Sequence, residues 1–262
     1  MSGVAPRLRF HVKQSTPDDR PRPAPLTPEE FQAEASVSDD ALARLKIYID
    51  LLRSRCVTTS LVSESSLVDV WRRHVLDSAQ LFPLLPADAK TAIDLGSGAG
   101  FPGLVVAILA RAENRDLDVM LTEANARRVQ FLRDVIDATE ARATLAHERI
   151  EAMKPAPKDV VMARALAPLE RLLGIAKPFI GPSTVCFFLK GQGVSQELTD
   201  SSKTWTMEVG KVPSRSDPSG TILALRKVMR RHARESRRPS AGSANHRYRQ
   251  SKGRGRKNDD GD

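Results

Sequence analysis

The stretch Ile93-Asp94-Leu95-Gly96-Ser97-Gly98-Ala99-Gly100-Phe101-Pro102-Gly103 decides the fold of this 262-residue chain. A short apolar run, Thr91 to Leu95, leads into it, and an apolar stretch of helical length, Leu104 to Ala112, follows it. A glycine-rich turn between a strand and a helix presents backbone N–H groups and a helix N-terminus to a ligand. The motif therefore predicts a ligand site at the carboxyl end of the first strand of an α/β sheet.

Two ligands fit glycines at this spacing. The pattern that ends at Gly103, G-x-G-x-x-G, is typical of dinucleotide sites, whereas the pattern that begins at Asp94, D-x-G-x-G-x-G, is typical of S-adenosylmethionine sites. We favour the second because the glycines begin directly after Leu95, so that Gly96 makes the turn. A carboxylate at the end of the strand also suits the cationic amino group and sulfonium of that cofactor. The predicted cofactor contacts of the loop are Asp94, Gly96, Gly98 and Gly100.

Glu123 ends the next strand-like run, where an acid can accept hydrogen bonds from both ribose hydroxyls of an adenosine. Three classes of protein stay open on these residues alone. The chain is an RNA methyltransferase, a nicotinamide-dependent oxidoreductase that uses the other glycine spacing, or a catalytically inactive RNA-binding protein on a methyltransferase-like scaffold.

Strand-like and helix-like stretches alternate from Thr91 onward, and this pattern predicts a parallel sheet covered on both faces. Helices are expected over the apolar periods that contain Val129 to Ile136 and Leu169 to Lys177. The last two strands are expected to form an antiparallel end, which completes a mostly parallel, seven-stranded, Rossmann-like sheet. The predicted strands are Thr91–Leu95, Leu117–Thr122, Ala143–Ala146, Asp159–Met162, Thr184–Leu189, Trp205–Val212 and Thr221–Val228.

The first ~90 residues carry helix signals and no strand signal. Thr27 and Ser38 are predicted N-caps, a helix is predicted over Leu42 to Leu52, and a further one from about Ser66 to Leu85. We divide the chain into a disordered or partly helical extension (1–37), a helical segment (38–90), a cofactor-binding domain (91–229) and a disordered basic tail (230–262).

The charge of the chain is concentrated at one end. Residues 226–262 contain 13 Lys and Arg against 4 Asp and Glu, and the preceding 225 residues are balanced at 28 of each. Two cysteines, no metal-ligand spacing, no membrane-length apolar run and no secretion signal predict a cytoplasmic protein without a metal site. Nothing in the sequence demands a dimer, so a monomer is expected.

Read together, these motifs resemble the RsmG (GidB) family of 16S rRNA guanine-N7 methyltransferases, from about Leu42 to Lys227. The resemblance implies a class I S-adenosylmethionine-dependent methyltransferase fold and 16S rRNA, or a small ribosomal subunit precursor, as partner. The segments that carry it are Arg73-His74-Val-Leu-Asp77-Ser78, Asp94 to Gly103, Glu123 with Arg128-Val-Gln-Phe-Leu-Arg133, Arg164-Ala165, and Leu189-Lys190-Gly191-Gln192.

The resemblance also implies roles for individual residues. Gly96 and Phe101 would contact the cofactor, and Ile150 and Glu151 would flank its adenine. Arg164 would reach the cofactor or the substrate. The residues expected to be catalytic are Arg164, Lys190 and His74, and the helix face expected to close over the pocket carries His74, Asp77 and Ser78.

The chemistry of N7 sets what such a site needs. The N7 atom of guanine has a free lone pair and no proton, so positioning is required and a general base is not. Cys186 lies in an apolar run, which argues against a cysteine nucleophile, and Met162-Ala163-Arg164-Ala165 replaces the Pro-Pro motif of amino-methylating enzymes. N7 is inaccessible in the deep major groove of an RNA helix, so the target base is expected in a loop or turned out of its stack.

Overall fold

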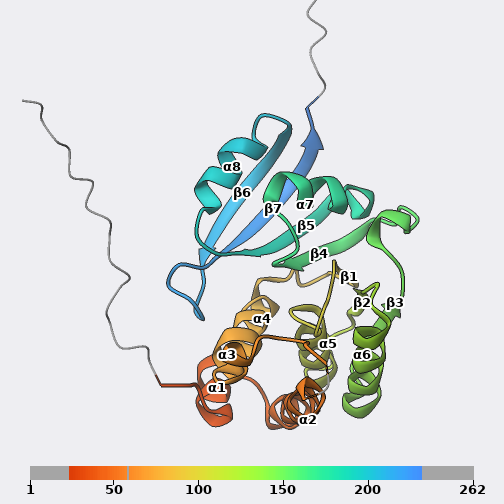
Figure 1. Cartoon of the computed structure of the whole chain (residues 1–262). Coiled ribbons are helices and arrows are strands. Elements are labelled where there is room, and N and C mark those ends of the chain that lie inside the picture. The colour runs from red at the N-terminus through yellow and green to blue at the C-terminus, as the bar shows by residue number, and fades with distance from the viewer. Residues whose placement is uncertain (1–23, 58, 232–262) are drawn as a thin grey trace, which may run out of the picture. The chain divides into compact units, whose positions relative to one another are not determined.

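Seven strands form one sheet in the order β3-β2-β1-β4-β5-β7-β6, in a computed structural model that describes residues 24–57 and 59–231 (Figure 1). Strands β1 to β5 are mutually parallel, and β7 runs antiparallel to both β5 and β6. The bounds are β1 (Thr91–Asp94), β2 (Asp118–Thr122), β3 (Ala143–Ala146), β4 (Lys158–Arg164), β5 (Ile180–Lys190), β6 (Trp205–Pro213) and β7 (Thr221–Arg230). The predicted Rossmann-like architecture is confirmed.

Two hydrophobic cores cover the two faces of this sheet. One contains apolar side chains of the N-terminal helices, α5 and α6, and the other contains those of α7, as Figure 1 shows by the helices below and above the sheet. Central strands contribute side chains to both cores, because Ala92 packs into the first and its neighbour Ile93 into the second. The helices are α1 (Pro28–Ala35), α2 (Asp39–Cys56), α5 (Gly103–Ala112), α6 (Ala126–Thr139), α7 (Leu169–Ala176) and α8 (Val194–Ser201), with short 3₁₀ turns η3 (Ile150–Ala152) and η4 (Lys177–Phe179).

The two predicted N-caps are confirmed. The Thr27 hydroxyl accepts a hydrogen bond from the Glu30 N–H, and the Glu30 carboxylate accepts one from the Thr27 N–H. Ser38 caps α2 in the same way through the Ala41 N–H. The helical segment shares the first core with the sheet, since Leu45 and Ile49 belong to the same cluster as Leu104.

The prediction of a single helix from Ser66 to Leu85 is wrong. This part of the chain forms four short helices, and the second is a π-helix in which the Asp77 N–H donates to the carbonyls of Arg72 and His74. In an α-helix that N–H would bond to the carbonyl of Arg73, which is therefore left for another donor. The pieces are α3 (Glu64–Leu67), η1 (Trp71–Leu76), α4 (Asp77–Ala79) and η2 (Phe82–Leu84).

Helix α8 is a second departure, because the sequence analysis did not predict it. It begins after Gly193, which has a φ of +87°. The predicted tail beyond Arg231 and the extension before Ala24 lie outside the described residues. Within the described residues no helix is long and apolar enough to cross a membrane, and no three His, Cys, Asp or Glu side chains group as metal ligands.

The glycines of the loop after β1 serve different physical needs. Gly103 is required by packing, because a Cβ there would lie 2.5 Å from the Asp94 Cβ and 2.6 Å from the Leu121 Cδ2. Close contact of α5 with β1 and β2 therefore depends on this missing side chain. Gly98, by contrast, has a φ of +58°, and a Cβ there would meet only the Gly96 carbonyl oxygen, at 3.9 Å.

The substitution Gly103→Ala tests this packing. We expect it to lower the free energy of unfolding by roughly 1–3 kcal/mol, because the backbone of α5 must move to accommodate the methyl group. Gly174→Ala in α7 is the matched control, since a Cβ there meets nothing within 4 Å. The control should be neutral or stabilising by roughly 0.5–1 kcal/mol. Equal urea-unfolding midpoints for Gly103→Ala and the parent would contradict the packing argument.

Candidate functional site

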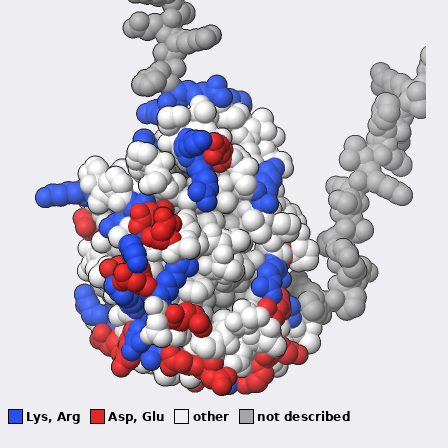
Figure 2. All heavy atoms as spheres, turned by 180° about the vertical axis from the view of Figure 1, so that it is seen from behind, with Lys and Arg blue, Asp and Glu red and all other residues white. Residues whose placement is uncertain are grey.

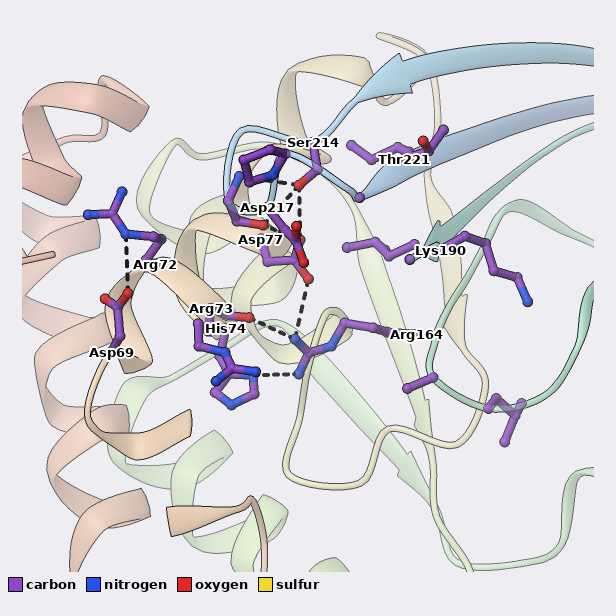
Figure 3. Close-up of a pocket in the computed structure, with 18 of the residues that line it drawn as sticks. Asp69, Arg72, Arg73, His74, Asp77, Arg164, Lys190, Ser214, Asp217 and Thr221 are labelled. Atoms are coloured by element: carbon purple, nitrogen blue, oxygen red, sulfur yellow. Dashed lines mark hydrogen bonds and ion pairs between the residues drawn. The ribbon is translucent and has the colours of Figure 1, made fainter. Parts of the chain in front are cut away.

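A cavity of about 1230 Å³ opens at the carboxyl ends of β4 and β5 (Figure 3). Four segments that are distant in the chain provide most of its lining, together with Pro25. They are the η1 region, the connection between β4 and α7, the stretch from Lys190 into α8, and the turn between β6 and β7. Three of the predicted site residues meet here, namely His74, Arg164 and Lys190.

Arg164 stands at the centre of the polar contacts in this cavity (Figure 3). Its Nη1 donates to the Arg73 carbonyl oxygen at 3.0 Å and lies 3.3 Å from Asp77 Oδ2, and its Nη2 lies 2.8 Å from His74 Nδ1. The guanidinium carbon also lies 5.2 Å from the centre of the Phe101 ring. The Arg73 carbonyl, to which the Asp77 N–H does not donate in the π-helix, thus accepts a hydrogen bond from Arg164.

These contacts fix the protonation state of His74. An arginine only donates, so Nδ1 is the acceptor and Nε2 carries the proton that it shares with Ser66 Oγ at 2.9 Å. Burial, followed by the charges of Arg164 and Arg73, lowers the pKa of His74 to about 3. The imidazole is therefore neutral, has both nitrogens bonded, and orients the guanidinium.

Asp77 joins Arg164 to the turn between β6 and β7. Its Oδ2 faces the guanidinium, while its Oδ1 accepts a hydrogen bond from Ser216 Oγ at 2.6 Å. The expectation that Ser78 shares this face of the pocket is wrong. Ser78 is fully buried and does not line the cavity, because its hydroxyl donates to the His74 carbonyl at 2.7 Å.

Glu123 lies beside the glycine loop, as predicted. One of its carboxylate oxygens accepts from the Gly98 N–H at 3.1 Å and the other from the Asn125 N–H at 2.8 Å. Oε2 also faces Arg128 Nη1 at 3.7 Å. Glu123 is thus held against the backbone of the loop at Gly98, and its contact with ribose hydroxyls stays a prediction.

Asp94 is turned toward the start of α5. Its Oδ2 accepts from the Gly103 N–H at 3.0 Å, and its Oδ1 is buried without a hydrogen-bond partner among the described residues. Burial raises the pKa of this carboxyl to about 6. Asp94 therefore holds the loop against the helix, and its contact with a ligand cation stays a prediction that depends on Oδ1.

One set of residues, called the wall below, borders both the glycine loop and the cavity. Leu166 lines the cavity, and its Cδ1 lies 2.8 Å from the position that a Cβ on Gly96 would occupy. Arg164 lines the cavity as well and reaches Phe101 of the loop. Ala165 between them has a φ of +52°, which is an unfavourable conformation for alanine. The wall is thus formed by three consecutive residues, Arg164 at the end of β4 and the two that follow it.

Lys190 binds the residue that follows this wall. Its ammonium group donates to the Ala167 carbonyl at 2.7 Å and pairs with Glu197 at 2.7 Å, and its side chain is 10% exposed. These are the contacts of a positioning residue, and a catalytic role for Lys190 stays a prediction. Glu197 was missed by the sequence analysis, because α8 was missed.

The remaining predicted cofactor contacts lie at the same end of the sheet. Gly100 is tightly packed, since a Cβ there would lie 2.8 Å from the Tyr48 hydroxyl. Ile150 and Glu151 begin η3, shortly after β3, with Ile150 half-buried and Glu151 exposed. Neither residue lines the cavity.

Comparisons with known proteins agree on one family. A family model described as GidB, rRNA small subunit methyltransferase G, matches residues 41–221. A curated protein of Paramagnetospirillum magneticum is 46% identical over 79% of this chain and 99% of its own length, and one of Parvibaculum lavamentivorans is 48% identical over 78% and 91%. Both bear the name ribosomal RNA small subunit methyltransferase G.

A solved structure is similar in fold. The crystal structure of a candidate O-methyltransferase from Klebsiella pneumoniae is 16% identical, with a TM-score of 0.50 over 75% of this chain and 94% of that one.

The protonation state of His74 predicts a pH dependence of stability. Between its folded pKa of about 3 and its ordinary value of 6.5 the unfolded chain binds a proton that the folded chain does not. The free energy of unfolding therefore falls as the pH is lowered through this window. His74→Gln removes this contribution, so the stability advantage of the parent should shrink by roughly 1–2 kcal/mol between pH 7 and pH 5.

Urea unfolding of both proteins across this range measures the effect. Asp94, whose raised pKa acts in the opposite sense, is present in both proteins and cancels in the difference. Parallel stability curves would show that His74 is charged in the folded chain.

Proposed function

The chain belongs to the rRNA small subunit methyltransferase G family, and we propose that it transfers a methyl group from S-adenosylmethionine to N7 of one guanine in 16S rRNA. The observation that carries this proposal is the shared wall between the glycine loop and the cavity. A donor on the loop and an acceptor base in the cavity would meet at Arg164 and Leu166.

The loop fits S-adenosylmethionine in three respects. Gly98 leaves space beside its backbone, the Glu123 carboxylate beside the loop is an acceptor for ribose hydroxyls, and the unpartnered Oδ1 of Asp94 suits a cationic ligand. The cofactor supplies a methyl group activated by its sulfonium. In the proposed assignment Gly96, Gly100 and Phe101 shape the loop around it, and Ile150 and Glu151 flank the adenine.

The polar groups of the cavity support transfer without a general base. His74 is neutral with both ring nitrogens bonded, and Asp77 is paired with Arg164. N7 of guanine carries no proton, so the transfer does not require either of them as a base. The residues instead fix a guanidinium beside the wall, where it would hold the base in line for the reaction. Holding the reactants in a defined geometry contributes several kcal/mol to such a step.

The charge of the cavity favours a base over a phosphate. It is lined by Arg72, Arg73, Arg164 and Lys190, and equally by Asp69, Asp77, Glu197 and Asp217. Three ion pairs join members of these sets, namely Asp69–Arg72, Asp77–Arg164 and Glu197–Lys190. A neutral cavity of about 1230 Å³ suits an uncharged base turned out of its stack.

The phosphates of the RNA require a different surface, and we propose that the tail after Arg230 provides it. Figure 2 shows basic side chains at the top of one face, where β7 ends, and acidic ones along the opposite rim. The basic tail continues from the basic end. In this proposal a cytoplasmic monomer acts on 16S rRNA or a small-subunit precursor, since one chain supplies every residue assigned above.

Methyl transfer to 16S rRNA from labelled S-adenosylmethionine tests the proposed function. We expect a single N7-methylguanosine, detected by chemical cleavage specific to that nucleoside. Arg164→Ala should lower the transfer rate by about 100-fold, because the group that fixes the base is lost. Arg164→Lys should stay impaired, because an ammonium cannot reach Asp77, His74 and the Arg73 carbonyl together.

Arg171→Ala is the control, since Arg171 is exposed on α7 and does not line the cavity. Its transfer rate should match that of the parent. Methyl groups found on an exocyclic amine or on a pyrimidine carbon would contradict the proposed acceptor.

The tail predicts a salt dependence of RNA binding. Deleting residues 232–262 should flatten the slope of log affinity against log salt, because a protein that contacts fewer phosphates releases fewer counterions when it binds. A variant of equal length whose tail Lys and Arg are replaced by Gln controls for chain length and should behave like the deletion. An unchanged slope in both variants would show that the tail does not contact phosphates.

A further inference from the structure

Tyr48 is a residue of α2 whose hydroxyl reaches the glycine loop. The residue is fully buried, and its hydroxyl donates a hydrogen bond to the carbonyl oxygen of Ala99. No other donor in residues 24–57 and 59–231 is bonded to this carbonyl. Burial raises the pKa of Tyr48 well above its ordinary value, so the hydroxyl keeps its proton and acts as a donor.

The first part of the loop is held by β2. Three consecutive N–H groups donate to the last residue of this strand and to the residue after it. They are those of Gly96, to Thr122 Oγ1 at 2.9 Å, of Ser97, to the Thr122 carbonyl at 2.8 Å, and of Gly98, to Glu123 Oε2 at 3.1 Å. Ala99 has no hydrogen bond to β2 in the described part of the chain, so at this point Tyr48 supplies the contact that fixes the loop.

Ala99 lies between two glycines with different surroundings. A Cβ on Gly98 would meet only the Gly96 carbonyl oxygen, at 3.9 Å, whereas a Cβ on Gly100 would lie 2.8 Å from the Tyr48 hydroxyl. Their φ angles are +58° and +104°. Glycine moves easily between such conformations and others, so the loop needs an external contact to stay in one of them. The hydrogen bond to Ala99 therefore keeps Gly100 against the core and leaves the side of Gly98 open.

The ring and the hydroxyl of Tyr48 have separate roles. The ring packs in the core, with its centre 5.2 Å from that of Phe101 and 6.2 Å from that of Phe131. A phenylalanine ring would make the same apolar contacts, and a buried hydroxyl costs free energy unless it is bonded. The bond to Ala99 is therefore what a tyrosine adds at this position.

We propose that Tyr48 is a positioning residue for the cofactor: its hydroxyl holds the Ala99 carbonyl, so that the loop is already in the conformation that binds S-adenosylmethionine. The helical segment then contributes to the cofactor site as well as to the cavity, because α2 carries Tyr48 and η1 carries His74. The inference rests on the proposed function and deepens it, since it assigns a role to a residue behind the loop.

The substitution Tyr48→Phe removes one oxygen atom and keeps the ring. The loop should then occupy its binding conformation for only a fraction of the time, and the apparent Kd rises by the inverse of that fraction. We expect the Kd of S-adenosylmethionine, measured by calorimetry, to rise about 10-fold, the effect of one lost hydrogen bond. The methyl transfer rate at saturating cofactor and the KM for 16S rRNA should stay within about 2-fold of the parental values, because the bound loop is the same.

This division separates positioning from stability. A residue that only stabilised the fold would change the fraction of folded protein, which lowers the rate and leaves the Kd unchanged. Thr139→Val is the matched control, because it also removes a fully buried hydroxyl, one that donates to the Val135 carbonyl at 2.7 Å at the end of α6. Its Kd for S-adenosylmethionine should equal that of the parent.

A measurement on the intact tyrosine covers the case in which Tyr48→Phe does not fold. The chain contains two tyrosines, Tyr48 and Tyr248, and the second lies outside the described residues. With 3-fluorotyrosine incorporated, the chain gives two fluorine resonances, and Tyr248→Phe identifies the one from Tyr48. We expect this resonance to shift when S-adenosylmethionine saturates the protein, because the cofactor changes the environment of the carbonyl that the Tyr48 hydroxyl binds.

The results separate the inference from the proposed function. An unchanged Kd in folded Tyr48→Phe, or a Tyr48 resonance that does not move on saturation, would overturn the role of Tyr48. If the parent does not bind S-adenosylmethionine, the proposed function fails and the inference fails with it. If the parent binds the cofactor and methylates no guanine, the proposed acceptor fails and the role of Tyr48 stands.

Discussion

The side chain of Arg164 is only 18% exposed, so its N–H groups need acceptors, and the chain supplies them from three sources. The π-helix η1 releases the Arg73 carbonyl, the neutral His74 provides a ring nitrogen, and Asp77 provides charge. No one of these three acceptors satisfies the guanidinium alone. An imidazolium could not accept, and a regular α-helix would have used the carbonyl for its own hydrogen bond.

This arrangement connects parts of the molecule that are far apart in the sequence. Arg164 ends β4, His74 and Asp77 lie in the helical segment, and Phe101 belongs to the loop after β1. Asp77 extends the connection to the β6–β7 turn through Ser216. The helical segment is thus part of the site as well as part of the hydrophobic core. A substrate in the cavity would meet a surface whose geometry is fixed before it binds.

Local patterns in the sequence were sufficient for the sheet and the cofactor loop. Strand runs such as Thr184–Leu189 and the glycines after β1 form short, regular patterns, so the order of residues reveals them, although the contacts that require Gly103 appear only in the fold. The π-helix could not be predicted, because it differs from an α-helix only in which carbonyls the N–H groups of one turn select, and no residue pattern marks that choice. Helix α8 has few apolar residues and escaped notice, and Glu197 with it. Lys190 was noticed, yet its partners Ala167 and Glu197 emerge only from the folded chain.

The most direct measurement is a crystal structure of the full chain with S-adenosylhomocysteine, the demethylated product of the cofactor. The account predicts the ribose hydroxyls on Glu123, the backbone of the ligand beside Gly98, and its sulfur facing the wall of Arg164 and Leu166, toward the cavity. A ligand bound elsewhere, or one whose sulfur is directed away from that wall, would contradict it.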